Sequence, residues 1–99
     1  MQLLGLIKLN EFKQKHADTR GALEAWQLEV EAIRWNDTQD IKRRYASASF
    51  LGDSRVIFNI KGNSYRLVVK VKYANGIVLI EWVGTHAEYT KLYVNQRSK

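Results

Sequence analysis

Polar and cationic side chains recur at alternate positions of residues 55–70, a segment that can form two paired strands. The dipeptide Gly62-Asn63 is a tight-turn signal and predicts a hairpin in which Arg55 faces Lys70. Side chains alternate between the two faces of a sheet, so one face carries Arg55, Asn59, Lys61, Ser64, Arg66 and Lys70. The other face carries Val56, Phe58, Ile60, Tyr65, Leu67 and Val69. Because like charges opposite each other destabilise a sheet, the polar face favours binding of an anion such as a phosphate.

Arg66 is the first candidate for a phosphate ligand on this face. The predicted register places it between Asn59 and Thr85 of the neighbouring strands, and a planar guanidinium can bind a phosphate through two hydrogen bonds. The structural alternative is a solvated arginine on an exposed sheet. Further candidate phosphate ligands are Arg55, Asn59, Asn63 and Lys70. Lys70 also has an ordinary explanation, because Glu81 faces it in the predicted register and could form an ion pair.

His86 follows the last predicted strand, beside the strand of Arg66, and Tyr89 comes one helical turn later. Imidazole is the side chain whose unperturbed pKa allows proton exchange near pH 7, so His86 could give or take a proton beside a bound phosphate. The alternative is a histidine that caps the final helix. Tyr89 could stack on a nucleic-acid base or pack in the core.

The charges of this chain are unevenly distributed. Residues 1–40 hold five lysines and arginines against seven carboxylates, a net charge of −2, whereas residues 41–99 hold eleven against three, a net charge of +8. The run Lys42-Arg43-Arg44 adds to the basic half, either as a nucleic-acid contact or as the exposed side of a short helix. A basic half of this size favours a polyanionic partner, of which nucleic acid is the commonest in cells.

Composition excludes several other kinds of protein. The 99 residues contain no cysteine and two histidines, so we expect no disulfide, no metal site and no cofactor. No apolar stretch is long enough to cross a membrane, and residues 1–7 are too short for a signal peptide, which predicts a cytoplasmic protein without a membrane partner. We expect one domain over residues 1–99.

Hydrophobic spacing predicts a strand at Met1–Leu4, helices at 7–16 and 21–35, and a short helix at 38–45 capped by Asn36 or Asp37. A connection at 46–54 leads to the first hairpin. A second hairpin turns at Asn75-Gly76, and its core face gains Val71, Tyr73, Val78, Ile80 and Trp82. A final helix at 86–93 and a polar tail at 95–99 complete the chain.

These elements predict an α+β fold with a small antiparallel sheet. The sheet consists of a C-terminal meander of three strands plus the N-terminal strand, and the helices pack on its apolar face.

The strings FNIKGNSYRLV at residues 58–68 and VGTHAEY at 83–89, together with Asp40-Ile41-Lys42 and Tyr45, resemble the HigB family of bacterial toxins within the RelE-like superfamily. The resemblance implies a RelE-like fold and an endoribonuclease that cleaves messenger RNA, generally on the ribosome. It also implies a HigA-type antitoxin with a helix-turn-helix domain. That antitoxin neutralises the toxin and represses the operon, so operator DNA would be bound only through the antitoxin.

In the mechanism that the resemblance implies, the RNA 2′-hydroxyl attacks the adjacent phosphate without a metal ion and cationic side chains stabilise the added negative charge. Arg66, His86 and Tyr89 occupy positions where the superfamily has catalytic residues, and Lys61 is the lysine that remains as a candidate base. Arg55, Asn59, Asn63, Lys70, Lys42, Arg43 and Arg44 would contact RNA. The alternative is a basic RNA-binding or protein-interaction module without turnover.

Overall fold

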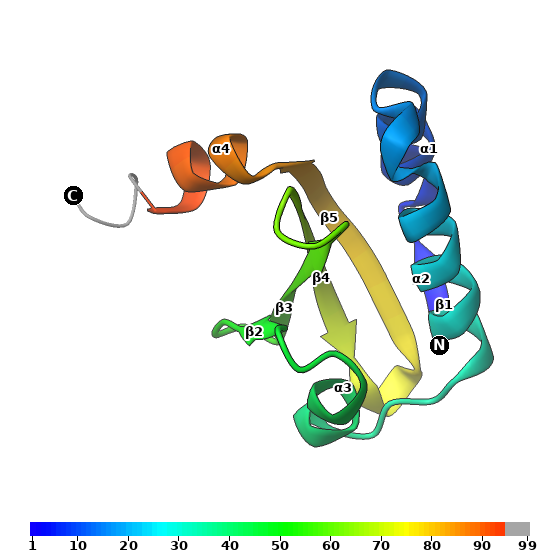
Figure 1. The fold of residues 1–99 in the computed structure, drawn as a ribbon. Helices are drawn as coiled ribbons and strands as arrows, with labels where there is room; N and C mark the ends of the chain where they lie inside the picture. Colours follow the sequence, from blue (N-terminus) through cyan, green and yellow to red (C-terminus); the bar gives the residue numbers. More distant parts are fainter. Residues whose placement is uncertain (95–99) are drawn as a thin grey trace.

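The computed structural model describes the backbone of residues 1–94 and the side chains of residues 1–92, so the predicted tail at 95–99 lies outside the described residues. Within this range a sheet of five strands has the order β1-β5-β4-β3-β2 (Figure 1). Its strands are β1 Gln2–Leu4, β2 Ser49–Phe50, β3 Arg55–Ile60, β4 Tyr65–Lys72 and β5 Ile77–Thr85. The predicted α+β class is confirmed.

Two features of the sheet correct the prediction. β1 pairs in parallel with β5, so the sheet is mixed and not purely antiparallel. β2 lies within the segment expected to be a connection and pairs antiparallel with β3. Alternation of apolar and polar residues carries no information on strand direction, and a strand of two residues is too short to produce a recognisable alternation.

The helices are α1 Leu6–Lys15, α2 Arg20–Ala32, α3 Thr38–Arg44 and α4 His86–Tyr89, with a 3₁₀ turn at Ala17–Thr19 and a π turn at Thr90–Val94. Asp37 caps α3 by accepting a hydrogen bond from the Asp40 N–H at 3.1 Å, one of the two predicted caps. α2 ends at Ala32, three residues before the predicted end of this helix, because the backbone of Ile33 is extended. The Ile33 side chain is 40% exposed. Among residues 1–94 none of the helices combines the length and apolar character needed to cross a lipid bilayer.

The hydrophobic core lies between the sheet and the first three helices. The predicted apolar face of the first hairpin is confirmed at Val56, Phe58, Ile60, Leu67 and Val69, which are all buried in this core. The helices contribute Leu9, Leu23, Trp26, Val30 and Ile41. Trp26 and Phe58 meet edge to face with ring centroids 5.4 Å apart. The opposite face of β3 and β4 carries the polar side chains, although Ile57 and Val68 at its centre are also buried.

The second hairpin differs from its predicted register. Its connection takes four residues, with Lys72 opposite Ile77, instead of the two expected at Asn75-Gly76. The longer turn keeps the predicted face for Val78 and Ile80, because it shifts the pairing by an even number of residues.

A β-bulge then changes the face of the rest of β5. Val69 faces Ile80 but Val68 faces Trp82, so Glu81 is the extra residue. As a result Trp82 leaves the core face, Val83 packs against the core instead, and Arg66 faces Gly84 rather than the predicted Thr85. A bulge of this kind re-aims side chains near functional sites.

Candidate functional site

Arg66 is buried, with 8% of its surface exposed, on the face of β4 opposite the core. Its Nη1 donates to the carbonyl oxygens of Asn63 at 3.1 Å and Tyr65 at 3.2 Å, and its Nη2 donates to Asn63 Oδ1 at 2.9 Å. The guanidinium carbon lies 6.0 Å from the ring centroid of Tyr89. The alternative of a solvated sheet arginine is therefore wrong. The hairpin loop holds the guanidinium in place, while Nε–H and one Nη2–H make no hydrogen bond to residues 1–92.

Asn63 positions Arg66 through both its backbone oxygen and its side-chain oxygen. The side-chain NH2 group is the donor that could bind a phosphate oxygen, so the predicted role of Asn63 as a phosphate ligand stays a prediction.

Trp82 belongs to the same group of side chains, although the sequence placed it in the core. Its ring centroid lies 6.3 Å from that of Tyr89, at an interplanar angle of 51°. The ring crosses Gly84, where an added Cβ would lie 2.4 Å from Trp82 Cη2. Only glycine fits at this position without moving the ring. A glycine inside a predicted strand is the one sequence signal of a bulge or a close approach that could have indicated this arrangement.

His86 is the first residue of α4, and its side chain is exposed. Its backbone N–H donates to the Ser64 carbonyl at 2.9 Å, so the start of α4 is tied to the loop that holds Arg66. The cap of α4 is Thr85, whose hydroxyl accepts from the Glu88 N–H at 3.1 Å while the Glu88 carboxylate accepts from the Thr85 N–H at 2.8 Å. The interpretation of His86 as the helix cap is therefore wrong.

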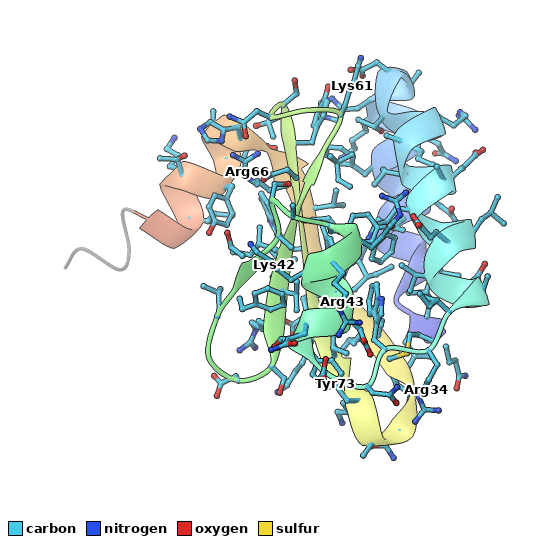
Figure 2. All side chains as sticks on the ribbon, turned by 60° about the horizontal axis from the view of Figure 1, so that its bottom comes forward. Arg34, Lys42, Arg43, Lys61, Arg66 and Tyr73 are labelled. Atoms are coloured by element: carbon cyan, nitrogen blue, oxygen red, sulfur yellow. The ribbon has the colours of Figure 1, made fainter. Side chains whose placement is uncertain are left out.

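Lys61 does not join this group, which corrects the prediction. Its Nζ donates to Asp18 Oδ2 at 3.0 Å, and Asp18 also accepts from the Tyr65 hydroxyl at 2.8 Å. Lys61 has a φ of 52°, so the alternation of the strand ends at Ile60 and the side chain turns towards α1 and α2. Figure 2 shows Lys61 beside these helices and Arg66 beneath α4. The hydrogen bonds from Lys61 and then Tyr65 hold the pKa of the Asp18 carboxyl below its ordinary value.

The remaining cations of the polar face form separate interactions. Arg55 donates to both carboxylate oxygens of Glu81, at 2.6 and 3.4 Å, and also contacts Asp53 at 3.3 Å. Because of the bulge, Glu81 forms its ion pair with Arg55 and not with Lys70, the partner that the predicted register gave it. Lys70 faces Arg55 across the two strands, as predicted, and is half-buried. Four residues along β3 separate Arg55 from Asn59, about 13 Å, so Arg55 lies away from Arg66.

Asn59 does lie opposite Arg66 as predicted, and its side-chain amide donates to the Ser47 carbonyl at 3.5 Å. Lys42 Nζ donates to the carbonyl of the adjacent Ala48 at 2.9 Å. The segment before β2 therefore connects Lys42 with the strand of Asn59.

The other two cations of the run point elsewhere. Arg43 pairs with Asp40 at 3.0 Å, and Arg44 bonds the carboxylate of Glu29 in α2. Lys42-Arg43-Arg44 is thus not a single cluster with Arg66 (Figure 2). Among the described residues, no group of three or more histidines or carboxylates is arranged to hold a metal ion.

The site that emerges consists of the side chains of Arg66, Tyr89 and Trp82, at the junction of the first hairpin loop, β5 and α4, where the backbone of His86 ties α4 to the loop. A family model described as the RelE-like toxic component of a toxin-antitoxin system matches residues 19–92, a range that includes all four residues. The class of protein is therefore a RelE-like toxin of a toxin-antitoxin system, which implies an antitoxin partner. Within this class the chain belongs to the HigB toxin family. A comparison with curated proteins gave no match.

Proposed function

We propose that this toxin is an endoribonuclease that cleaves messenger RNA on the ribosome, in the cytoplasm. A HigA-type antitoxin with a helix-turn-helix domain would neutralise it, and operator DNA would be bound only through that antitoxin. The observation that carries the proposal is the buried guanidinium of Arg66, held by the hairpin loop between Tyr89 and the start of α4. A fixed cation in a site with little water stabilises developing negative charge without having to reorganise during the reaction.

The reaction would be a transesterification. The 2′-hydroxyl oxygen attacks the adjacent phosphorus and its proton passes to solvent, while the bond from phosphorus to the 5′-oxygen breaks. Arg66 donates its two remaining N–H groups to the non-bridging phosphate oxygens, where charge accumulates. His86, in its protonated form, gives a proton to the leaving 5′-oxygen. The products are a 2′,3′-cyclic phosphate and a 5′-hydroxyl end, and no metal ion is needed.

Tyr89 and Trp82 would hold the bases on either side of the scissile phosphate. Their ring centroids lie 6.3 Å apart, the Tyr89 ring lies 6.0 Å from the guanidinium carbon, and aromatic stacking contributes about 1–3 kcal/mol per base in single-stranded nucleic-acid sites. Such stacking orients the 2′-hydroxyl relative to the phosphate. Asn59 and Lys42 extend the polar face along the RNA, and Lys70 and Arg55 contribute more distant positive charge.

The test is inducible expression of the chain in a bacterial host, with and without its antitoxin. The proposal predicts growth arrest, new 5′-hydroxyl ends within messages, and recovery when the antitoxin is expressed. Arg66→Ala should remove the effect, whereas Lys72→Ala, an exposed lysine at the far end of β4, should leave it unchanged. Normal growth with abundant soluble toxin and intact messages would contradict the proposal.

A further inference from the structure

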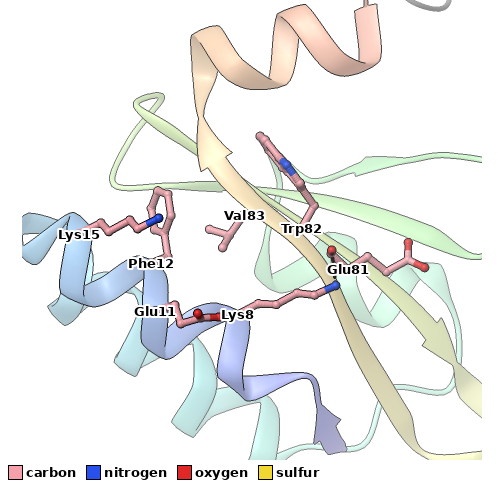
Figure 3. A pocket seen from close by; sticks show the side chains of 7 residues that line it. All are labelled: Lys8, Glu11, Phe12, Lys15, Glu81, Trp82 and Val83. Atoms are coloured by element: carbon pink, nitrogen blue, oxygen red, sulfur yellow. Dashed lines mark hydrogen bonds between the residues drawn. The ribbon is translucent and has the colours of Figure 1, made fainter.

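A groove runs between α1 and α4 across β5 (Figure 3). One part, about 370 Å³, lies beside Lys8, and another, about 470 Å³, reaches Lys91 and Leu92. Both parts are lined by Phe12, Lys15, Trp82 and Val83, so together they form one continuous depression. Volumes in this range are typical of binding sites.

The floor of the groove is a strand edge. β5 has nine residues, but β1 pairs with it only at Ile77–Leu79. Along Ile80–Thr85 the edge that faces α1 pairs with no other strand of residues 1–94. The Glu81 carbonyl instead accepts a hydrogen bond from Lys8 Nζ at 2.9 Å (Figure 3). The bond from Lys8 comes from a flexible side chain, so an incoming strand can displace it and form several backbone hydrogen bonds along this edge.

The charges of the groove distinguish between possible occupants. Lys8, Lys15 and Lys91 are exposed around it, which favours an acidic ligand. Of the carboxylates, Glu81 already pairs with Arg55 and Glu88 bonds the Thr85 N–H. RNA is the less suitable ligand, because the Ile80–Thr85 edge of β5 presents backbone N–H and C=O groups, which match the backbone of a peptide and not a continuous row of phosphates.

An extended peptide fits these features better. Its backbone can pair with the edge of β5, while alternate side chains face opposite directions. Acidic residues on one side would meet the three lysines, and apolar residues on the other would cover Phe12, Trp82 and Val83.

We propose that the groove binds an extended segment of the antitoxin that alternates acidic and apolar residues and adds as a strand to β5. The family of this chain implies an antitoxin partner, and the groove offers that partner backbone, charge and apolar contacts together. The proposal does not depend on the ribonuclease activity. Trp82 lies in both the groove and the group around Arg66, so a bound strand would also contact the proposed site directly.

The experiment is hydrogen–deuterium exchange of the full toxin, alone and in complex with the antitoxin encoded with it. We expect the amides of residues 80–85 that point away from β4 to exchange more slowly in the complex, because an added strand would accept hydrogen bonds from them. The double variant Lys15→Glu, Lys91→Glu should weaken antitoxin binding about tenfold or more at low salt. The matched control Lys72→Glu, an exposed lysine outside the groove, should not.

Two results would overturn this inference. The first is tight antitoxin binding with unchanged exchange at residues 80–85. The second is protection of these amides by a single-stranded RNA oligonucleotide but not by the antitoxin, which would assign the groove to nucleic acid. Thermal unfolding of each variant verifies that it folds, and single-turnover RNA cleavage by the free toxin tests the ribonuclease proposal separately.

Discussion

Replacing Arg66 with alanine should affect folding and catalysis to very different extents. The substitution removes three hydrogen bonds to Asn63 and Tyr65 from a side chain that is 8% exposed. Asn63 is exposed, so water can replace the guanidinium at its oxygens and part of the loss is recovered. We therefore expect a destabilisation of about 1–3 kcal/mol. For a domain of this size, each 1 kcal/mol lowers the melting temperature by about 4–8 °C.

The effect on cleavage should be larger. Loss of one fixed donor to the charged transition state typically costs about 10²–10³-fold in rate. The assay is single-turnover cleavage of a defined message on ribosomes, with melting temperature measured on the same preparation. Arg66→Lys keeps the positive charge but loses the planar fork, so it should retain the fold and recover only part of the rate.

Asn63→Ala tests whether the loop positions Arg66. It removes the acceptor at 2.9 Å from Nη2 but leaves the cation in place. The rate should fall less than for Arg66→Ala, whereas Asn75→Ala, in the other hairpin, should have no effect on it. A folded Arg66→Ala protein that cleaves at the wild-type rate would refute this reasoning.

Three further outcomes follow from the structure. His86→Gln should preserve ribosome binding and melting temperature while lowering the single-turnover rate about 10²–10⁴-fold, because Thr85 caps α4; a loss of stability without a loss of rate would end the catalytic role of His86. Leu67→Ala, fully buried next to Arg66 in sequence, should cost about 2–5 kcal/mol of unfolding free energy through the cavity it leaves, measured by denaturant titration. Asp18→Asn should destabilise the protein at pH 6: the pKa of Asp18 is lowered below 3.8 in the folded state, so its contribution is present above that value and disappears as pH falls through the folded pKa. Wild type and Asp18→Asn should then converge in denaturant titrations as the pH falls through the folded pKa of Asp18, and a constant difference would contradict the assignment.

The register of the first hairpin could be predicted from the sequence, because side chains alternate regularly between its two faces. The predicted pairs Arg55 with Lys70 and Asn59 with Arg66 are confirmed, since a buried face strongly specifies register. The pairing of the second hairpin is changed by a bulge at Glu81, and the alternation of residues in the sequence does not indicate that bulge. The direction of β1 and the existence of β2 are likewise decided by packing between segments distant in the sequence.

The same reasons explain which parts of the site could be found. Arg66 follows from its position on the polar face, and the helix that brings His86 and Tyr89 follows from helical spacing. Lys61 was misplaced because its positive φ reverses the side chain just beyond the strand. Trp82 was missed because the bulge exchanges it with Val83 between the two faces. Positions decided by regular alternation were predictable, and positions decided by a local irregularity were not.

The most direct test of the ribonuclease proposal is to map the ends produced when purified toxin acts on ribosomes that carry a defined synthetic message. We expect fragments with 5′-hydroxyl and 2′,3′-cyclic phosphate ends, formed by wild-type toxin and by Lys72→Ala. Arg66→Ala should form them about 10²–10³-fold more slowly. A message that stays intact while the toxin still arrests translation would contradict the ribonuclease proposal and assign the basic face to binding alone.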